Sequence, residues 1–321
     1  APRHHIDAAY RTITTGRRAV CAMLVFMALR AAVFGCSGQL GIELVRELKA
    51  RGYQVVGWER AAVDISNGEK VERVLAGVDP SVVFNAAAYN QVDVAEREPQ
   101  AAYQANALGV RNLALACRQV DAQFVHFSTD YVFDGTAQQP YREADVPHPL
   151  GAYAVSKLAG ELYAQAYLKQ PLIVRTCGVF GPGGLTTNRG NFVEFMLRRA
   201  ADGQPIRVVE DHIGSPTYAP LLAARTIDLL EKNQHGMFHI GGGQPLSWFN
   251  FAKLIFEAAG LHPSLQATNE REYRTPAHRP KYSALSNEKM ERAGLAPMPP
   301  LAECVKTYLA VRETMLHPAK V

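Results

Sequence analysis

Cysteine is scarce in this 321-residue sequence, and the few cysteines present are scattered. There are five of them, an odd number, with no C-x-x-C spacing: Cys21, Cys36, Cys117, Cys177 and Cys304. A disulfide framework favours an even set, and a cysteine zinc site favours closely spaced pairs. The sequence therefore disfavours both, and we expect a protein of a reduced compartment, the cytoplasm.

Long hydrophobic runs and an excess of one charge are missing from most of the chain. The apolar run AVCAMLVFMAL (19–29) is too short to span a membrane, and it continues into RAAVFGCSG, which cleavage of a secretion signal would truncate. Residues 1–30 hold five arginines and one aspartate, which leaves 29 basic and 29 acidic residues in the other 291. A neutral folded part argues against a nucleic-acid surface, and no membrane partner is expected. We expect residues 1–26 to be an extension that need not belong to the fold, with Met27 as a natural start.

The segment RAAVFGCSGQLGIELVRELKARG (30–52) has the pattern of a strand, a glycine turn and a helix. Gly35, Gly38 and Gly41 follow the apolar run AAVF, and a helical apolar pattern comes next. Glycines let the backbone approach a pyrophosphate, and the helix N-terminus offers unpaired N–H groups and a favourable dipole. This context predicts a dinucleotide cofactor; a glycine turn without a ligand is the alternative.

The second strand, YQVVGWER (53–60), ends where the adenosine ribose of such a cofactor is expected. Glu59 would accept a hydrogen bond from a 2′-hydroxyl, whereas Arg60 would favour a 2′-phosphate, so NADH and NADPH both stay open. VDIS (63–66) then predicts a third strand that carries Asp64 past the adenine.

Strand-like and helix-like segments alternate as far as residue 242. Apolar strands are expected at 81–88, 122–130, 171–176 and 236–242, with helices near 67–77, 100–119, 153–168 and 219–232. Such alternation predicts an α/β fold with a doubly wound parallel sheet, in which ligands bind beyond the carboxyl ends of the strands. The small residues Ala86, Ala87 and Ala88 and the hydroxyls of Ser128 and Thr129 fall at two of these ends.

The stretch GAYAVSKLAG (151–160) places Tyr153 and Lys157 one helical turn apart, on the helix that follows Thr129. Reduction of a ketone needs a hydride on carbon and a proton on oxygen. A phenol, with a usual pKa near 10, holds that proton at neutral pH, and a nearby ammonium favours the phenolate that remains. A threonine hydroxyl can stabilise the developing charge. The three residues thus predict a reductase site; a solvated helix face is the alternative.

These motifs resemble an extended short-chain dehydrogenase/reductase, and several longer blocks are more specific. The blocks NAAAYNQVDVAE (85–96), STDYVFDG (128–135), YAVSKLAGE (153–161), NFVEFML (191–197), DHIGSPTYA (211–219) and RPKYSAL (279–285) are similar to the dTDP-4-dehydrorhamnose reductase family. The resemblance implies a Rossmann domain (27–176 and 222–243) and a small C-terminal α/β substrate lobe (177–221 and 244–321). It also implies NAD(P)H-dependent reduction of a nucleotide-linked 4-keto-6-deoxy sugar to dTDP-L-rhamnose.

The motifs and the resemblance together assign roles to residues. Thr129, Tyr153 and Lys157 would be catalytic. Besides Tyr153 and Lys157, the cofactor side would comprise Gly35, Ser37, Gly38, Gln39, Leu40, Gly41, Glu59, Arg60, Asp64, Ile65, Ala86, Ala87 and Ala88. The substrate side would comprise Ser128, Tyr131, Asn191, Asp211, His212, Pro216 and Thr217. From their chemistry alone, further candidates for contact with a diphosphate are Arg189, Arg207, Arg274 and Arg279.

Two departures from the family pattern concern the sugar and a metal. After RT (175–176) the family usually has Ser-Trp-Val-Tyr, whereas this chain has CGVF (177–180). Either Phe180 or Tyr131 would then replace the tryptophan missing at Gly178, or the pocket would admit other 4-keto sugars. Some members link a dimer through magnesium; Glu43 fits one acid, but DGQPIRV (202–208) lacks the second. A magnesium site is therefore doubtful, no metal is predicted, and a homodimer stays open.

Two other functions are compatible with the same fold. FDGTAQQPYREAD (133–145) is similar to a loop of a regulatory subunit of methionine adenosyltransferase, which would make this chain a non-catalytic NADP-binding protein; the intact DHIGSPTY favours an enzyme. A 4,6-dehydratase would need an Asp-Glu pair after the threonine, where this chain has Asp130-Tyr131. Further along, SWFNFAKLIFEAAG (247–260) predicts an amphipathic helix with Trp248 in the core.

Overall fold

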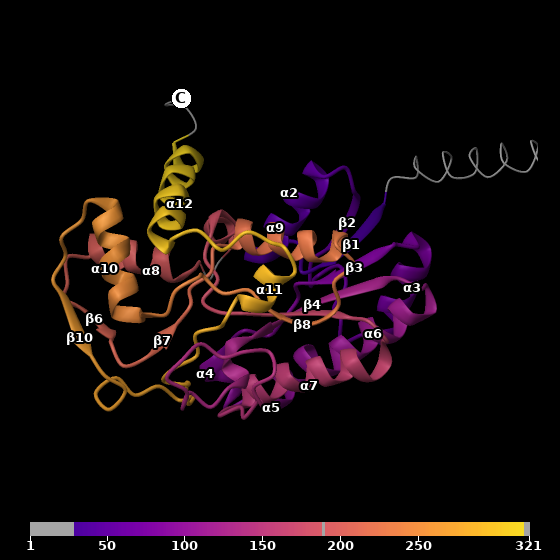
Figure 1. Cartoon of the computed structure of the whole chain (residues 1–321), viewed down its shortest axis with the longest axis horizontal. Helices are drawn as coiled ribbons and strands as arrows, with labels where there is room; N and C mark the ends of the chain where they lie inside the picture. Colours follow the sequence, from indigo (N-terminus) through magenta and orange to yellow (C-terminus); the bar gives the residue numbers. More distant parts are fainter. Residues whose placement is uncertain (1–28, 188–189, 318–321) are drawn as a thin grey trace, which may run out of the picture.

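A sheet of six parallel strands forms the centre of the protein. The computed structural model describes residues 29–187 and 190–317, so the predicted extension of residues 1–26 lies outside it. The strand order is β2-β1-β3-β4-β5-β8 (Figure 1). The strands are β1 (Arg30–Phe34), β2 (Gln54–Trp58), β3 (Val82–Asn85), β4 (Gln123–Thr129), β5 (Leu172–Thr176) and β8 (Gly236–His239). The direction of winding reverses between β1 and β3, which confirms the predicted doubly wound fold.

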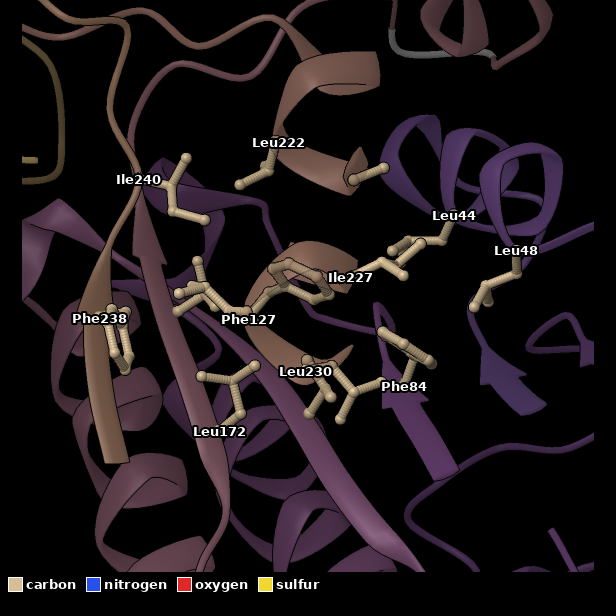
Figure 2. Packing of buried hydrophobic residues seen from close by; sticks show 14 of the residues in the cluster. Leu44, Leu48, Phe84, Phe127, Leu172, Leu222, Ile227, Leu230, Phe238 and Ile240 are labelled. Atoms are coloured by element: carbon tan, nitrogen blue, oxygen red, sulfur yellow. The ribbon is translucent and has the colours of Figure 1, made fainter. Parts of the chain in front are cut away.

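Helices cover both faces of this sheet. Ala31 and Val33 of β1 lie in a core with α2 (Gln39–Ala50) and α9 (Ala219–Glu231), part of which Figure 2 shows. Ala32 and Phe34 point the other way, into a core with α3 (Gly68–Val78), α6 (Gly109–Gln119) and α7 (Ala152–Tyr167). A parallel sheet buried on both faces needs strands that are apolar throughout, which explains the continuous apolar runs of the sequence.

Two predicted elements differ from the structure. The region 100–119 is not one helix, because a π-helical turn, Gln104–Leu108, joins α5 (Pro99–Tyr103) to α6. Asn106 in that turn is buried and exchanges two hydrogen bonds with the backbone of Tyr89, at 2.8 and 2.9 Å, just before α4 (Val92–Ala95). The strand expected at 63–66 is a turn, because Asp64 Oδ1 accepts from both the N–H and the hydroxyl of Ser66, at 2.9 and 2.7 Å.

The C-terminal part of the chain builds its own apolar core beside the sheet (Figure 1). This core around Phe180 is called the second core, as distinct from the core on the two faces of the central sheet. β6 (Ile206–Val209) pairs in parallel with β10 (Leu265–Thr268), and β7 (Ile213–Gly214) pairs antiparallel with β9 (Leu246–Ser247). α8 (Phe192–Ala201), α10 (Trp248–Ala259) and α12 (Leu301–Leu316) contribute to this core together with the buried Phe180. α11 (Glu288–Arg292), by contrast, packs Met290 into the core of the central sheet.

Candidate active site

A cavity of about 900 Å³ opens at the carboxyl ends of β1, β3, β4 and β5, where the strand order reverses. Doubly wound sheets bind their ligands at this point. Its lining includes most of the predicted cofactor and catalytic residues, namely Ser37, Gly38, Gln39, Leu40, Arg60, Ala86, Ala87, Ala88, Thr129, Tyr153 and Lys157. Two residues predicted for the substrate side, Ser128 and Tyr131, line it as well. A second cavity, of about 770 Å³, lies at the opposite ends of the strands and contains none of the predicted site residues. The first cavity is therefore the candidate active site.

The turn between β1 and α2 lines this cavity from Ser37 to Leu40, whereas the predicted Gly35 and Gly41 lie outside the lining. Gly35 has a φ of 78°, and a Cβ there would lie 2.7 Å from the backbone nitrogen of Ala87. A Cβ at Gly41 would collide with the carbonyl oxygen of Gly35. Gly38 is the N-cap of α2, so no capping side chain stands in front of the first N–H groups of that helix. The free N–H groups of this helix N-terminus suit a pyrophosphate, and a side chain at Gly35 or Gly41 would displace the backbone that forms the turn.

Glu59 and Arg60, which left the choice of cofactor open, are placed differently. Arg60 lines the cavity with a side chain that is 83 % exposed, whereas Glu59 lies outside the lining. Asp64 and Ile65 also lie outside it, and Asp64 Oδ2 lies 3.2 Å from Arg60 Nε. Burial would raise the pKa of Asp64, but hydrogen bonds from Ser66 and Arg60 bring it below its usual value. An exposed guanidinium at the rim suits a 2′-phosphate.

The three predicted catalytic residues come together in the cavity. Thr129 ends β4, and Tyr153 and Lys157 lie one turn apart on α7. Lys157 is buried, and its Nζ donates a hydrogen bond to the carbonyl oxygen of Phe127 at 2.5 Å. Burial lowers the pKa of Lys157 to about 8, although the nearby charge of Glu161 raises it. Below that pH the side chain is an ammonium, as the predicted chemistry requires.

Further hydroxyl groups line the cavity at the ends of β4 and β5. Thr129 Oγ1 donates to Asp130 Oδ1 at 3.1 Å and accepts from the Tyr131 N–H at 3.2 Å. Burial raises the pKa of Asp130 to about 6. The buried hydroxyls of Ser128 and Thr176 both line the cavity, and neither has a hydrogen-bond partner within residues 29–187 and 190–317. Buried polar groups are nearly always paired, so these two hydroxyls are suited to meet a polar ligand.

Five residues predicted for the substrate side lie outside the cavity lining: Asn191, Asp211, His212, Pro216 and Thr217. Their contacts fix the surrounding loops. Asn191 caps α8 and donates to Gln39 Oε1 at 3.0 Å, and Asp211 accepts from the Glu270 N–H at 3.1 Å. Thr217 is buried and donates to the carbonyl oxygen of Ser215 at 2.9 Å. These residues shape the loops behind the cavity, and their roles toward substrate stay predictions.

The three described arginines proposed for a diphosphate lie outside the lining as well. Arg279 forms a two-point ion pair with Asp93, at 3.0 and 2.8 Å. Arg207 is paired with a glutamate, and Arg274 is exposed. Arg189 falls outside the described residues.

Several cavity residues were missed by the sequence interpretation: Asn90, Val92, Asp130, Thr176, Val179 and Trp248. Tyr153 Oη lies 3.4 Å from Asn90 Oδ1, a contact from a distant loop that no local pattern signals. The prediction that Trp248 belongs to the core is wrong in part, because this residue is half-buried and lines the cavity. Trp248 is the first residue of α10 and lies next to a loop, and this position was the signal in the sequence that its side chain could face a cavity.

Glu43, which the resemblance connects with magnesium in some relatives, is buried in α2. It accepts hydrogen bonds from the Gly183 N–H at 3.1 Å and from Arg46 at 2.7 Å. Burial raises the pKa of Glu43 above its usual value. Across the described ranges, no group of three or more His, Cys, Asp or Glu residues could hold a metal ion. Glu43 thus fixes the loop at Gly183 to the glycine-turn helix.

Comparison with known proteins agrees with this geometry. A family model described as the RmlD substrate binding domain matches residues 29–313. A dTDP-4-dehydrorhamnose reductase of Aggregatibacter actinomycetemcomitans is 36 % identical over 282 residues, which cover 84 % of this chain and 94 % of that protein. The chain belongs to the dTDP-4-dehydrorhamnose reductase family. Another relative, the spore coat polysaccharide biosynthesis protein SpsK of Bacillus subtilis, is 39 % identical over 285 residues, 89 % of this chain and 98 % of SpsK.

Solved structures of a dTDP-4-dehydrorhamnose reductase and of a UDP-glucose 4-epimerase share the fold. The dTDP-4-dehydrorhamnose reductase of Bacillus anthracis in complex with NADP is 34 % identical, with a TM-score of 0.85, over 89 % of this chain and 100 % of that one. The UDP-glucose 4-epimerase of Thermus thermophilus in complex with NAD is 25 % identical, with a TM-score of 0.78, over 88 % and 98 % of the two chains. The family and the Rossmann-type fold predicted from sequence are confirmed.

Proposed function

We propose that this protein reduces the C4 keto group of dTDP-4-dehydro-L-rhamnose to give dTDP-L-rhamnose, with NADPH preferred and NADH also used. The observation that carries the proposal is the gathering of Thr129, Tyr153 and Lys157 in the cavity that the glycine turn also lines. Membership of the reductase family supports the substrate, and the NADP held by the Bacillus anthracis relative supports the cofactor.

The side chains of the cavity account for the proton and the charge in this reaction. Bound NADPH supplies the hydride that C4 receives. Tyr153 donates its phenolic proton to the carbonyl oxygen and is left as a phenolate, which the buried Lys157 ammonium favours. Thr129 turns its hydroxyl from Asp130 towards the substrate oxygen, and the Ser128 hydroxyl adds a second donor for the developing negative charge.

The binding roles follow from the same cavity. We infer that the turn from Gly35 to Gly41 holds the pyrophosphate, that Arg60 meets the 2′-phosphate, and that the small residues 86–88 leave room for a cofactor ring. Ser128 and Tyr131 meet the sugar directly. The substrate side is completed from behind by the loop-fixing residues Asn191, Asp211, His212, Pro216 and Thr217.

The test is NADPH oxidation with dTDP-4-dehydro-L-rhamnose, in the wild type and in Tyr153→Phe. Loss of a general acid should slow turnover by about 10²–10⁴-fold, with NADPH binding retained. Tyr163→Phe, on the same helix but outside the cavity, is the matched control and should turn over normally. Near-native kcat in Tyr153→Phe would show that the proton donor is another group. A wild type that binds NADPH yet reduces no 4-keto sugar nucleotide would instead support the regulatory function.

We also infer a cytoplasmic enzyme, and the homodimer that the sequence leaves open is a matter for experiment. Four free cysteines in the described residues suit a reducing compartment, and no helix among those residues is long and apolar enough to cross a membrane. The separate core around Phe180 supports the division into a Rossmann domain (27–176 and 222–243) and a substrate lobe (177–221 and 244–321). The segment of the lobe around α11 departs from it, because Met290, Leu295 and Met298 pack in the core of the central sheet. Light scattering with and without Mg²⁺ would show whether the chain is a monomer, a dimer or a metal-linked dimer.

A further inference from the structure

Gly178, where the reductase family usually carries a tryptophan, lines the cavity just after β5. The space beside it is filled. A Cβ added to Gly178 would lie 2.9 Å from Cη2 of Trp248 and 3.3 Å from Cα of Pro216. The φ of Gly178 is 51°, in the left-handed region that favours glycine. The tip of the Trp248 indole therefore lies where a side chain at position 178 would begin.

The Trp248 indole is held firmly in this place. The backbone N–H of Trp248 donates to the carbonyl oxygen of His212 at 3.1 Å, which ties the start of α10 to the substrate-side loop. Its ring meets Phe192 edge-on with centroids 4.8 Å apart, and the Phe251 centroid lies 6.1 Å away. One part of the indole thus packs in the second core, while the half-buried residue still lines the cavity. The result is a rigid apolar wall.

This wall lies near the reacting groups. Thr129 and Thr176 are register partners on β4 and β5, and Gly178 follows Thr176 by two residues. The indole tip therefore reaches the same end of the strand pair as the catalytic threonine.

The two residues expected to replace the family tryptophan are placed elsewhere. Phe180 is fully buried in the second core and lies outside the cavity lining, so it cannot serve. Tyr131 does line the cavity, but its ring meets Tyr153 edge-on at 6.1 Å, on the side of the proton donor.

We propose that Trp248 is the residue that selects for a 6-deoxy sugar, an inference that rests on the proposed function. A 6-deoxy sugar presents a methyl group at C6, and an indole offers a large, stiff apolar surface to such a group. A C6 hydroxyl in its place would lie against an indole surface that offers it no hydrogen-bond acceptor, at a cost in desolvation. Trp248, which comes from the second core, supplies the surface that the family places at position 178. Its loss should lower kcat/KM for the 6-deoxy substrate by about 10–200-fold, while the affinity for NADPH stays unchanged.

The first test observes the unmutated indole. The chain has two tryptophans, and Trp58 lies outside the cavity lining, packed on Phe34 with centroids 4.9 Å apart. In Trp58→Phe the emission comes from Trp248 alone. With NADP⁺ bound, dTDP-L-rhamnose should change this emission, whereas saturating dTDP, which lacks the sugar, should not. An emission that dTDP-L-rhamnose leaves unchanged at concentrations that inhibit turnover, or that dTDP changes equally, overturns the proposal.

The second test compares variants by kcat/KM and by NADPH affinity. Trp248→Ala should show the loss of about 10–200-fold with the 6-deoxy substrate and a smaller loss with a 4-keto sugar nucleotide that carries a C6 hydroxyl, and Trp248→Phe should show a smaller change of the same kind. Equal losses with both sugars would overturn the selection. Gly178→Ala should show a loss of the same kind because its methyl group displaces the indole; Gly52→Ala is its control, since Gly52 is also left-handed, with a φ of 83°, but has nothing within 4 Å. Circular dichroism checks folding, and the fluorescence test decides if Trp248→Ala does not fold.

The outcomes separate this inference from the proposed function. A folded Trp248→Ala variant that keeps the kcat/KM of an active wild type overturns the selection by Trp248 alone. A wild type that does not reduce dTDP-4-dehydro-L-rhamnose overturns the proposed function, and the selection by Trp248 with it.

Discussion

Replacement of Glu161 by glutamine should lower the free energy of unfolding by about 3–5 kcal/mol. Glu161 on α7 binds Arg175 on β5 through two hydrogen bonds, Nε to Oε1 at 2.9 Å and an Nη to Oε2 at 2.6 Å. The two side chains are only 2 % and 4 % exposed. In Glu161→Gln the guanidinium keeps its charge, loses its anionic partner and cannot reach water. Since domains are stable by about 5–15 kcal/mol, the loss would be a large share of the total.

Urea unfolding followed by circular dichroism measures this loss as a lower midpoint at an unchanged m value. Glu257→Gln is the matched control, because Glu257 forms an exposed pair with Lys253 at 3.9 Å, and exposed pairs contribute about 0–1 kcal/mol. The double variant Glu161→Leu/Arg175→Met should recover most of the loss, since neither charge of the pair is then left buried without its partner. A loss in Glu161→Gln no larger than that in Glu257→Gln would refute the reasoning.

Glu161→Gln should also change the pKa of Lys157 in the active site. Burial lowers the pKa of Lys157 to about 8, and the charge of Glu161 opposes that effect. Without this charge the pKa of Lys157 falls further, so the ammonium loses its proton at a lower pH. The alkaline limb of the kcat/KM profile should therefore move to lower pH in Glu161→Gln, while an unmoved limb would show that another group sets it.

Three more outcomes can be checked directly. Arg60→Ala should weaken binding of NADPH and spare NADH, because the guanidinium meets only the 2′-phosphate; equal loss in equilibrium titrations would contradict this. In the wild type, kcat/KM should fall as pH rises through about 8, where Lys157 loses its proton, and a profile that stays flat there would exclude that role. Gly41→Ala should weaken NADP binding and lower the Tm by collision with the Gly35 carbonyl, whereas Gly77→Ala in α3, with nothing within 4 Å, should be neutral or stabilising by about 0.5–1 kcal/mol.

The sheet and the cofactor half of the site could be predicted because their signals are local in sequence. The run AAVF, the glycines that follow it and the helix after them lie within one segment, and the structure keeps them in that order as β1, the turn and α2. Tyr153 and Lys157 share one helix, so their meeting needed only helical periodicity. Their approach to Thr129 followed from the rule that successive elements of an α/β fold are neighbours.

The substrate half could not be predicted in the same way, because its contacts join distant segments. Arg279 looked like a phosphate ligand by its chemistry, but Asp93, far away in the sequence, pairs with it. Trp248 looked like a core residue by its helical position, yet the second core covers only part of its ring. Short polar contacts also overrode the pattern at residues 63–66, where the side chain of Asp64 closes a turn in place of the expected strand.

The two halves of the cavity therefore constrain sequence change differently. The cofactor side depends on a tightly packed backbone turn, and a side chain at Gly35 or Gly41 would collide with neighbouring backbone atoms, so this half tolerates little variation. The sugar side is made of side chains from separate elements, which can be exchanged while the sheet is kept. Gly178 and Trp248 show the limit on such exchange, because they share one space. Gly178→Trp alone would place a second indole where the Trp248 indole already lies. A tryptophan can therefore occupy position 178 only if Trp248 is replaced by a smaller residue at the same time.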